Sequence, residues 1–175
     1  NLDLDYLNPD SSLKLLMHLD RATEYEETTF NYFDFSKNGN NASTVTASRP
    51  LRVYGKYGYG LDFNGIDDYL FIKNSSSLNL SDAFTLSAWV NPESINESGY
   101  IFAKTDYNST GGYGLYWNGI NNTISLMYGS RNGVNSTASF TDYEEWVHVA
   151  ISKDNSGNVY FYRNGVQVSS ASGVT

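Results

Sequence analysis

An Asn-Gly pair set between alternating residues is the feature that most constrains how this chain can fold. From residue 146 to residue 168, apolar side chains recur with a period of two, which is typical of β-strands. Asn164-Gly165 interrupts this pattern, and both central residues of a type I′ turn need positive φ. Residues 154–158, Asp-Asn-Ser-Gly-Asn, carry the chemistry of a second turn. The stretch therefore predicts three antiparallel strands joined by two tight turns.

Similar turn signals recur along the whole chain. Asn-Gly occurs five times, beginning at residues 38, 64, 118, 132 and 164. No segment sustains a helical period of 3.6, and many short strands separated by turn residues are typical of a sandwich or barrel. Phe84, Leu86, Ala88 and Val90 are expected on one face of a strand. Further strands are predicted at Tyr100–Lys104, Gly114–Trp117, Thr123–Tyr128 and Val159–Arg163.

Five segments, taken in order, resemble one known family. They are Leu15–Asp20, Asp34–Asn40, Tyr59–Leu70, Ala83–Pro92 and residues 145–168 with their Trp-x-His-Val-Ala start. Together they resemble laminin G-like domains of the concanavalin A-like lectin/glucanase superfamily. The resemblance implies an all-β fold, a two-sheet antiparallel jelly-roll sandwich. It also implies that His18 and His148 lie within strands, and that Trp89 and Trp146 belong to the core.

The length of 175 residues suits one domain. We expect residues 1–12 to be an N-terminal arm or the end of a preceding segment, and residues 13–175 to form the sandwich. Domains of the resembled family usually continue beyond the Asn-Gly-Val hairpin, so we expect this sandwich to be incomplete at its C-terminus. An incomplete sheet exposes an edge, and an edge can be completed by a strand from a neighbouring chain.

Composition narrows the range of partners and the location. The net charge of −8 disfavours nucleic acid, because phosphate binding needs a basic surface. There is no apolar run of about eighteen residues, so membrane insertion is not expected. There is no cysteine. An extracellular or cell-surface location is expected, because Asn-x-Ser/Thr sequons are frequent. Glycosylation is predicted at Asn41, Asn74, Asn79, Asn96, Asn108, Asn121 and Asn135.

Catalytic residues are not predicted. Glucanases on the resembled scaffold carry a Glu-x-Asp-x-x-Glu strand, and this chain has none. Glu144-Glu145 and Asp67-Asp68 are adjacent pairs, and neighbours in a strand point to opposite faces, so neither pair forms the facing carboxylates of a glycosidase. We therefore expect a chain that is not an enzyme.

The best metal candidate is the segment from Asp34 to Asn40. Asp34, Ser36 and Asn38 stand at positions 1, 3 and 5 of a calcium loop, Gly39 stands at position 6, and Asn40 offers a backbone carbonyl. The acid expected at position 12 is missing. The resemblance also implies that calcium is a possible cofactor. The alternative is an Asx-rich turn in which Asp34 and Ser36 bind their own backbone.

A group of aromatic residues is the candidate ligand site. Tyrosine rings stack on sugar faces, and asparagine amides both donate and accept hydrogen bonds. Aromatic residues are also favoured in strands, so packing or an intersubunit surface is the alternative. The predicted ligand-binding residues are Tyr107, Tyr113, Tyr116, Trp117 and Tyr128.

Two functions follow from these observations, with an enzyme as a minor third. The first is a non-catalytic recognition or adhesion module that binds a glycan or a surface protein, with calcium as a possible aid. The second is a structural subunit of a surface filament, appendage or layer, completed by self-assembly with neighbouring chains. A glycoside hydrolase is the minor alternative.

Overall fold

The computed structural model describes residues 9–21, 27–93, 97–104, 112–129, 132–141 and 144–173. The chain divides into two compact units, Asn1–Asn79 and Leu80–Thr175. All paired strands in the described ranges are antiparallel. None of the described helices is long and apolar enough to cross a membrane.

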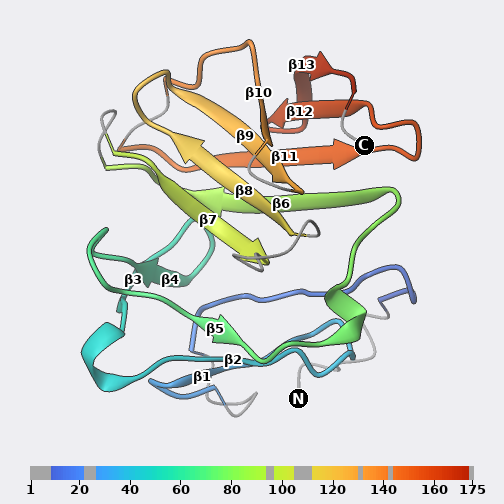
Figure 1. The fold of residues 1–175 in the computed structure, drawn as a ribbon. Coiled ribbons are helices and arrows are strands. Elements are labelled where there is room, and N and C mark those ends of the chain that lie inside the picture. The colour runs from blue at the N-terminus through green and yellow to red at the C-terminus, as the bar shows by residue number, and fades with distance from the viewer. Residues whose placement is uncertain are drawn as a thin grey trace. The chain divides into compact units, whose positions relative to one another are not determined.

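The first unit contains short strands and two short 3₁₀ helices. Its three-stranded sheet has the order β1-β2-β5, formed by Asn31–Tyr32, Ala42–Ser43 and Phe71–Ile72. A separate hairpin pairs β3 (Leu51–Tyr54) with β4 (Tyr59–Asp62), and all of these strands are labelled in Figure 1. The 3₁₀ helices are η3 (Thr46–Ser48) and η4 (Ser76–Leu78).

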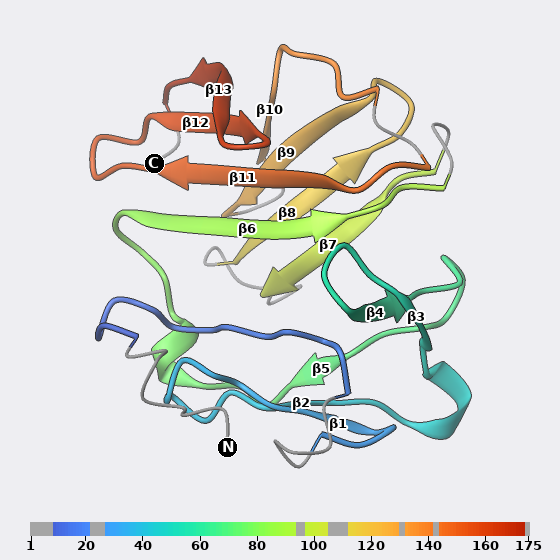
Figure 2. The same ribbon diagram turned by 180° about the vertical axis from the view of Figure 1, so that it is seen from behind.

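The second unit is a sandwich of two four-stranded sheets. One sheet has the order β10-β9-β8-β7, and the other has the order β13-β12-β11-β6 (Figures 1 and 2). The first comprises β7 (Gly99–Lys104), β8 (Tyr113–Asn118), β9 (Thr123–Tyr128) and β10 (Asn132–Asn135). The second comprises β6 (Phe84–Val90), β11 (Val147–Lys153), β12 (Val159–Arg163) and β13 (Val166–Ala171). This architecture confirms the all-β antiparallel sandwich.

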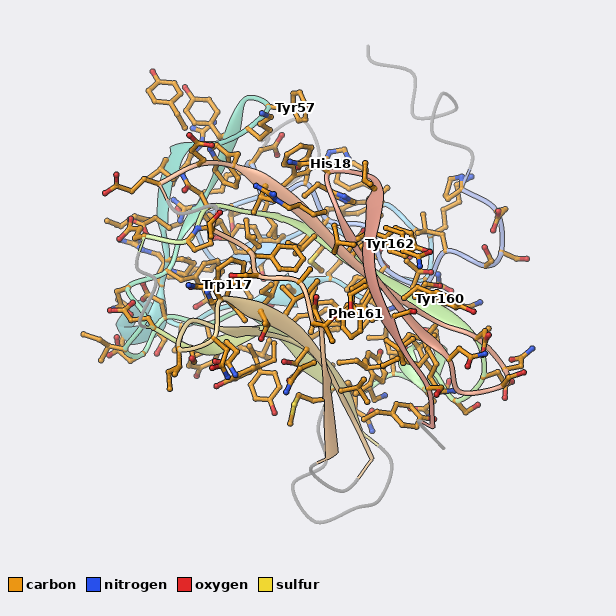
Figure 3. The ribbon with its side chains drawn as sticks, turned by 90° about the horizontal axis from the view of Figure 1, so that it is seen from above. His18, Tyr57, Trp117, Tyr160, Phe161 and Tyr162 are labelled. Atoms are coloured by element: carbon orange, nitrogen blue, oxygen red, sulfur yellow. The ribbon has the colours of Figure 1, made fainter. Side chains whose placement is uncertain are left out.

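One core fills the space between the two sheets. Leu115, Ile124 and Leu126 come from one sheet, while Ile151 and Phe161 come from the other, and each is fully buried. Alternation explains which residues face inward. Phe161 is buried, whereas its neighbours Tyr160 and Tyr162 are half-buried on the opposite face of β12 (Figure 3). The period-two pattern of the sequence therefore selects the inner face correctly.

The hairpin predicted at Asn164-Gly165 is confirmed. Both residues have positive φ, 49° and 81°, as a type I′ turn requires. The Asn164 side chain also accepts a hydrogen bond from the backbone N–H of His148, at 2.9 Å. This contact ties the turn to the neighbouring strand β11.

Three expectations about local structure were wrong. Leu15–Asp20 was expected to form a strand but does not. Its backbone binds the Asp34 loop instead, because the N–H of Leu16 donates to the Asp34 carboxylate. His18 therefore lies outside any strand, and its ring stacks on Phe35 at 4.1 Å. Asn132-Gly133 is not a turn but part of β10. His148 does lie within β11, as expected.

The expected core position of Trp89 was also wrong. Trp89 is 39% exposed and packs beside the ring of His148, 5.4 Å away. The physical reason is the strand alternation: Phe84 and Leu86 face the core, so a residue an odd number of positions further along faces outward. Trp117, which is 7% exposed, is the tryptophan of the core.

Candidate functional site

The Asp34 carboxylate organises the loop that was the metal candidate. Its Oδ1 accepts hydrogen bonds from the N–H groups of Leu16 (3.0 Å) and Ser36 (2.9 Å). Its Oδ2 accepts from the Ser36 hydroxyl (2.8 Å) and the N–H of Asn40 (2.9 Å). The residue is 1% exposed, so this carboxylate is a buried acceptor with four protein donors.

This donor set does not fit calcium. A carboxylate has about four lone-pair positions, and the four donors occupy them. The amide of Asn40 is also engaged, since its NH2 donates to Lys14 O and to Ser77 Oγ. Within the described ranges, no group of three or more His, Asp or Glu residues could hold a metal. The geometry favours the Asx turn, the alternative to a calcium loop at these residues.

The loop forms one wall of a polar cleft within the first unit. The cleft has a volume of about 390 Å³, within the range of small-molecule sites. The other wall is β5 and the segment after it, and β5 is held against β2 by the pairs Ala42↔Ile72 and Ser43↔Phe71. The cleft is lined by Asn38, Gly39, Asn40, Asn41, Ser43, Phe71, Ile72, Lys73, Asn74 and Ser75.

Side-chain hydrogen bonds hold the two walls in place. Asn40 Nδ2 donates to Ser77 Oγ at 2.9 Å, and the Ser77 hydroxyl contacts that of Ser75 at 2.8 Å. Asn41 Oδ1 accepts from the backbone N–H of Asp34 at 2.9 Å, so the NH2 group of an Asn41 that carries no glycan can donate to a ligand. Phe71, 42% exposed, adds an aromatic surface. The cleft therefore combines amides with one apolar ring.

The described members of the predicted aromatic ligand group, Tyr113, Tyr116, Trp117 and Tyr128, belong to the second unit and do not form one surface. Tyr113 and Trp117 are 5% and 7% exposed and belong to the core, so they favour the packing alternative. Burial raises the pKa of the Tyr113 hydroxyl above its ordinary value of 10.0. Tyr116 points to the other face of β8, half-buried, and its ring meets Tyr100 edge-on at 5.1 Å. Tyr107 lies outside the described residues.

Tyr128 is held by contacts on its ring and at its hydroxyl. Its ring stacks on Phe84 at 6.0 Å, and Lys153 Nζ lies 5.1 Å from the ring centroid. Its hydroxyl donates to the backbone carbonyl of Ser81 at 3.0 Å. These contacts favour a packing role for the Tyr128 side chain over a role in ligand binding. Of the described candidates, Tyr116 retains an outward-facing ring beside the exposed Tyr100.

The predicted glycosylation sites are accessible where the structure describes them. The asparagine is exposed in each of those five sequons, at Asn41, Asn74, Asn79, Asn121 and Asn135. Asn96 and Asn108 lie outside the described residues. Attachment of a glycan needs an exposed asparagine, so these sites stay predictions that the burial pattern permits.

Phe71, Lys73 and Asn74 line the cleft although no local sequence signal predicts them as ligand-binding residues. Asn74 was singled out as a sequon, but nothing local connects it to residue 38. Only the pairing of β2 with β5 brings residues 38–43 beside residues 71–75. A turn signal was available for the β3–β4 hairpin, since Gly55 and Gly58 flank its tip between two alternating runs.

Comparisons with known proteins place the chain in a family. A family model described as the concanavalin A-like lectin/glucanases superfamily, laminin G type, matches residues 63–175, more than half of the chain. The crystal structure of the binding domain of Paraclostridial Mosquitocidal Protein 1 is similar, with a TM-score of 0.62 at 17% sequence identity. The similarity covers 82% of this chain and 40% of that chain. No curated protein matches the sequence. The chain belongs to the laminin G-like family of the concanavalin A-like lectin/glucanase superfamily.

Proposed function

We propose that this chain is a non-catalytic extracellular recognition module that binds a glycan, and that the cleft between residues 38–43 and 71–75 is its binding site. The observation that carries the proposal is the chemistry of the cleft. Asparagine amides line both of its walls beside the exposed ring of Phe71. Amides pair with sugar hydroxyls, and an aromatic ring covers the C–H face of a sugar.

Family membership supports binding as the general activity. The similar structure is described as a binding domain, and the superfamily contains lectins. The family match includes Phe71 to Ser75 of the cleft but not Asn38 to Ser43. The specific ligand is therefore proposed from the residues of this chain. The proposal assigns no role to calcium, because the Asp34 carboxylate already has four protein donors.

The test is a glycan panel titrated against the purified chain, with two matched variants. Phe71→Ser removes the exposed ring of the cleft, and Ile66→Ser removes an 88% exposed apolar side chain that does not line it. We expect a panel glycan to bind wild type and Ile66→Ser, and to bind Phe71→Ser at least about ten-fold more weakly. Thermal unfolding of each variant checks that it is folded.

Other results would replace the proposal. If Phe71→Ser bound the glycan as tightly as wild type, the binding site would lie outside the cleft. Cleavage of a bound glycan, detected as shorter products by mass spectrometry, would contradict the non-catalytic assignment. Growth of large particles in light scattering, with no panel glycan bound, would instead support the structural-subunit alternative.

A further inference from the structure

The β3–β4 hairpin of the first unit carries tyrosine side chains that core packing does not explain. Tyr54, Tyr57 and Tyr59 are 83%, 74% and 40% exposed. Tyr57 lies in the turn of this hairpin (Figure 3). Single exposed apolar residues are ordinary, but a group of exposed rings on one short hairpin marks an interaction site.

Two of these rings form an ordered column with an arginine. Tyr54 and Tyr59 are directly opposite in the strand register, and their rings stack at 5.4 Å with an interplanar angle of 17°. The Arg52 guanidinium lies 3.5 Å from the centroid of the Tyr59 ring. Arg52 Nε in turn donates to the backbone carbonyl of Asp20 at 3.1 Å. The column therefore begins at Arg52, which is anchored to the backbone carbonyl of Asp20. It continues through the Tyr59 ring and ends at the Tyr54 ring.

The turn of the hairpin supports this arrangement. The N–H of Gly55 donates to the carbonyl of Gly58 at 3.0 Å, and Gly58 has a φ of +71°. A methyl group at Gly55 would lie 2.7 Å from the backbone oxygen of Tyr59, so that position has no room for a side chain. Since the strands are held this closely, Tyr54 is stacked before a ligand arrives. A stacked ring loses less rotamer freedom on binding.

We propose that the column of Arg52, Tyr59 and Tyr54 is a platform on which the flat C–H face of a pyranose ring stacks. This contact is distinct from the cleft between residues 38–43 and 71–75, and it rests on the proposed function in that the ligand class is a glycan. The sugars expected are β-1,4-linked hexoses of the gluco configuration, because their ring substituents are all equatorial and leave only axial C–H groups on the two ring faces.

The size and charge of the platform favour a sugar over other partners. A stable protein interface buries about 800 Å² on each partner, whereas the column presents one outer ring, which matches one sugar ring. The chain carries a net charge of −8, which disfavours stacking on a nucleobase of a polyanion. The tyrosine hydroxyl can also donate to and accept from sugar hydroxyls at the ring edge.

The experiment titrates the full chain with cellopentaose and chitopentaose, by calorimetry and by saturation-transfer NMR. Tyr54→Ser removes the outer ring, and we expect about ten-fold weaker binding and loss of transfer to sugar C–H protons. Tyr54→Trp keeps a ring and is expected to retain binding. Leu51→Ser is the matched control, since Leu51 is 58% exposed on the opposite face of the same hairpin.

The outcomes separate this proposal from the proposed function. Weaker binding by folded Tyr54→Ser, with wild-type binding by Tyr54→Trp and Leu51→Ser, supports the platform. Wild-type affinity in Tyr54→Ser, together with loss in Phe71→Ser, overturns the platform and leaves the cleft as the site. Failure of both pentasaccharides to bind wild type overturns the platform, and the proposed function fails only when the whole glycan panel also fails.

Discussion

The carboxylate of Asp34 accepts a hydrogen bond from the backbone N–H of Asn40, 2.9 Å away across the loop. This bond closes the turn that presents Asn38 to Asn41 to the cleft. A negative charge that accepts from N–H groups stabilises more than a neutral acceptor does. The residue that suggested a metal from the sequence therefore has a defined role in shaping the proposed binding site.

Replacing Asp34 with Asn should destabilise the first unit and weaken ligand binding together. The amide keeps one acceptor oxygen, but its NH2 group faces groups that are themselves donors, so buried hydrogen bonds are lost. We expect the free energy of unfolding to fall by about 2–4 kcal/mol. Urea unfolding measures the free energy of unfolding. Glu93→Gln, at an exposed position in the second unit, is the control and should change it little. An Asp34→Asn variant as stable as wild type would contradict the turn assignment.

Calcium offers a direct check on the same loop. A ligand that binds only the folded state raises the unfolding midpoint, by mass action. With Asp34 saturated by protein donors, we expect the thermal midpoint to be equal in excess calcium and in chelator. A higher midpoint in calcium that disappears in Asp34→Asn would restore the metal-loop interpretation.

Replacing Gly165 with Ala should destabilise the β12–β13 hairpin. Gly165 has a φ of +81°, and a Cβ in the left-handed region costs roughly 1–2 kcal/mol. Gly99→Ala is the control, because an added methyl there meets nothing within 4 Å and its φ is not in that region. The two free energies of unfolding, measured in denaturant, should differ by about that amount. Equal values would mean that the turn relaxes without strain.

Asp154 should contribute to the loss of stability of the second unit at acid pH. Hydrogen bonds from the Asn158 side chain and backbone, and from the Ser156 N–H, lower the pKa of this carboxyl below its ordinary value of 3.8. A lowered folded-state pKa contributes stability above the ordinary pKa, and this contribution is lost as the pH falls through the lower value. Asp154→Ala should therefore be less stable than wild type at neutral pH, with the difference shrinking below about pH 4. A difference that stays constant down to pH 2 would contradict this.

The two tryptophans at 89 and 117 should differ in their contribution to stability. Trp117→Ala removes a ring that is 7% exposed and packs edge-on against Phe140 at 6.2 Å, so we expect a loss of about 3–5 kcal/mol. Trp89 is 39% exposed, so Trp89→Ala should cost clearly less. Denaturant unfolding of both variants makes the comparison. A larger loss of stability in Trp89→Ala than in Trp117→Ala would contradict the outward-facing position of Trp89.

Local signals were sufficient for most of the sandwich. Strands β9 and β12 occur with the predicted bounds, and the predicted turn at Asn164-Gly165 has the expected positive φ values. Strand alternation and turn chemistry depend on near neighbours in the chain, so the sequence expresses them directly. The family resemblance implies a core position for Trp89, whereas its register with Phe84 and Leu86 in β6 places it on the outer face.

The binding surfaces required the tertiary structure. Asn41 and Phe71 lie thirty residues apart in sequence and become neighbours in the cleft only through the pairing of β2 with β5. In the same way, the saturation of Asp34 depends on the distant N–H of Leu16. Period and composition determined an all-β chain with an Asx-rich loop and many surface asparagines. Which donors meet Asp34, and which rings stay exposed, was decided by long-range contacts, because a side chain's partners depend on segments that sequence spacing does not bring together.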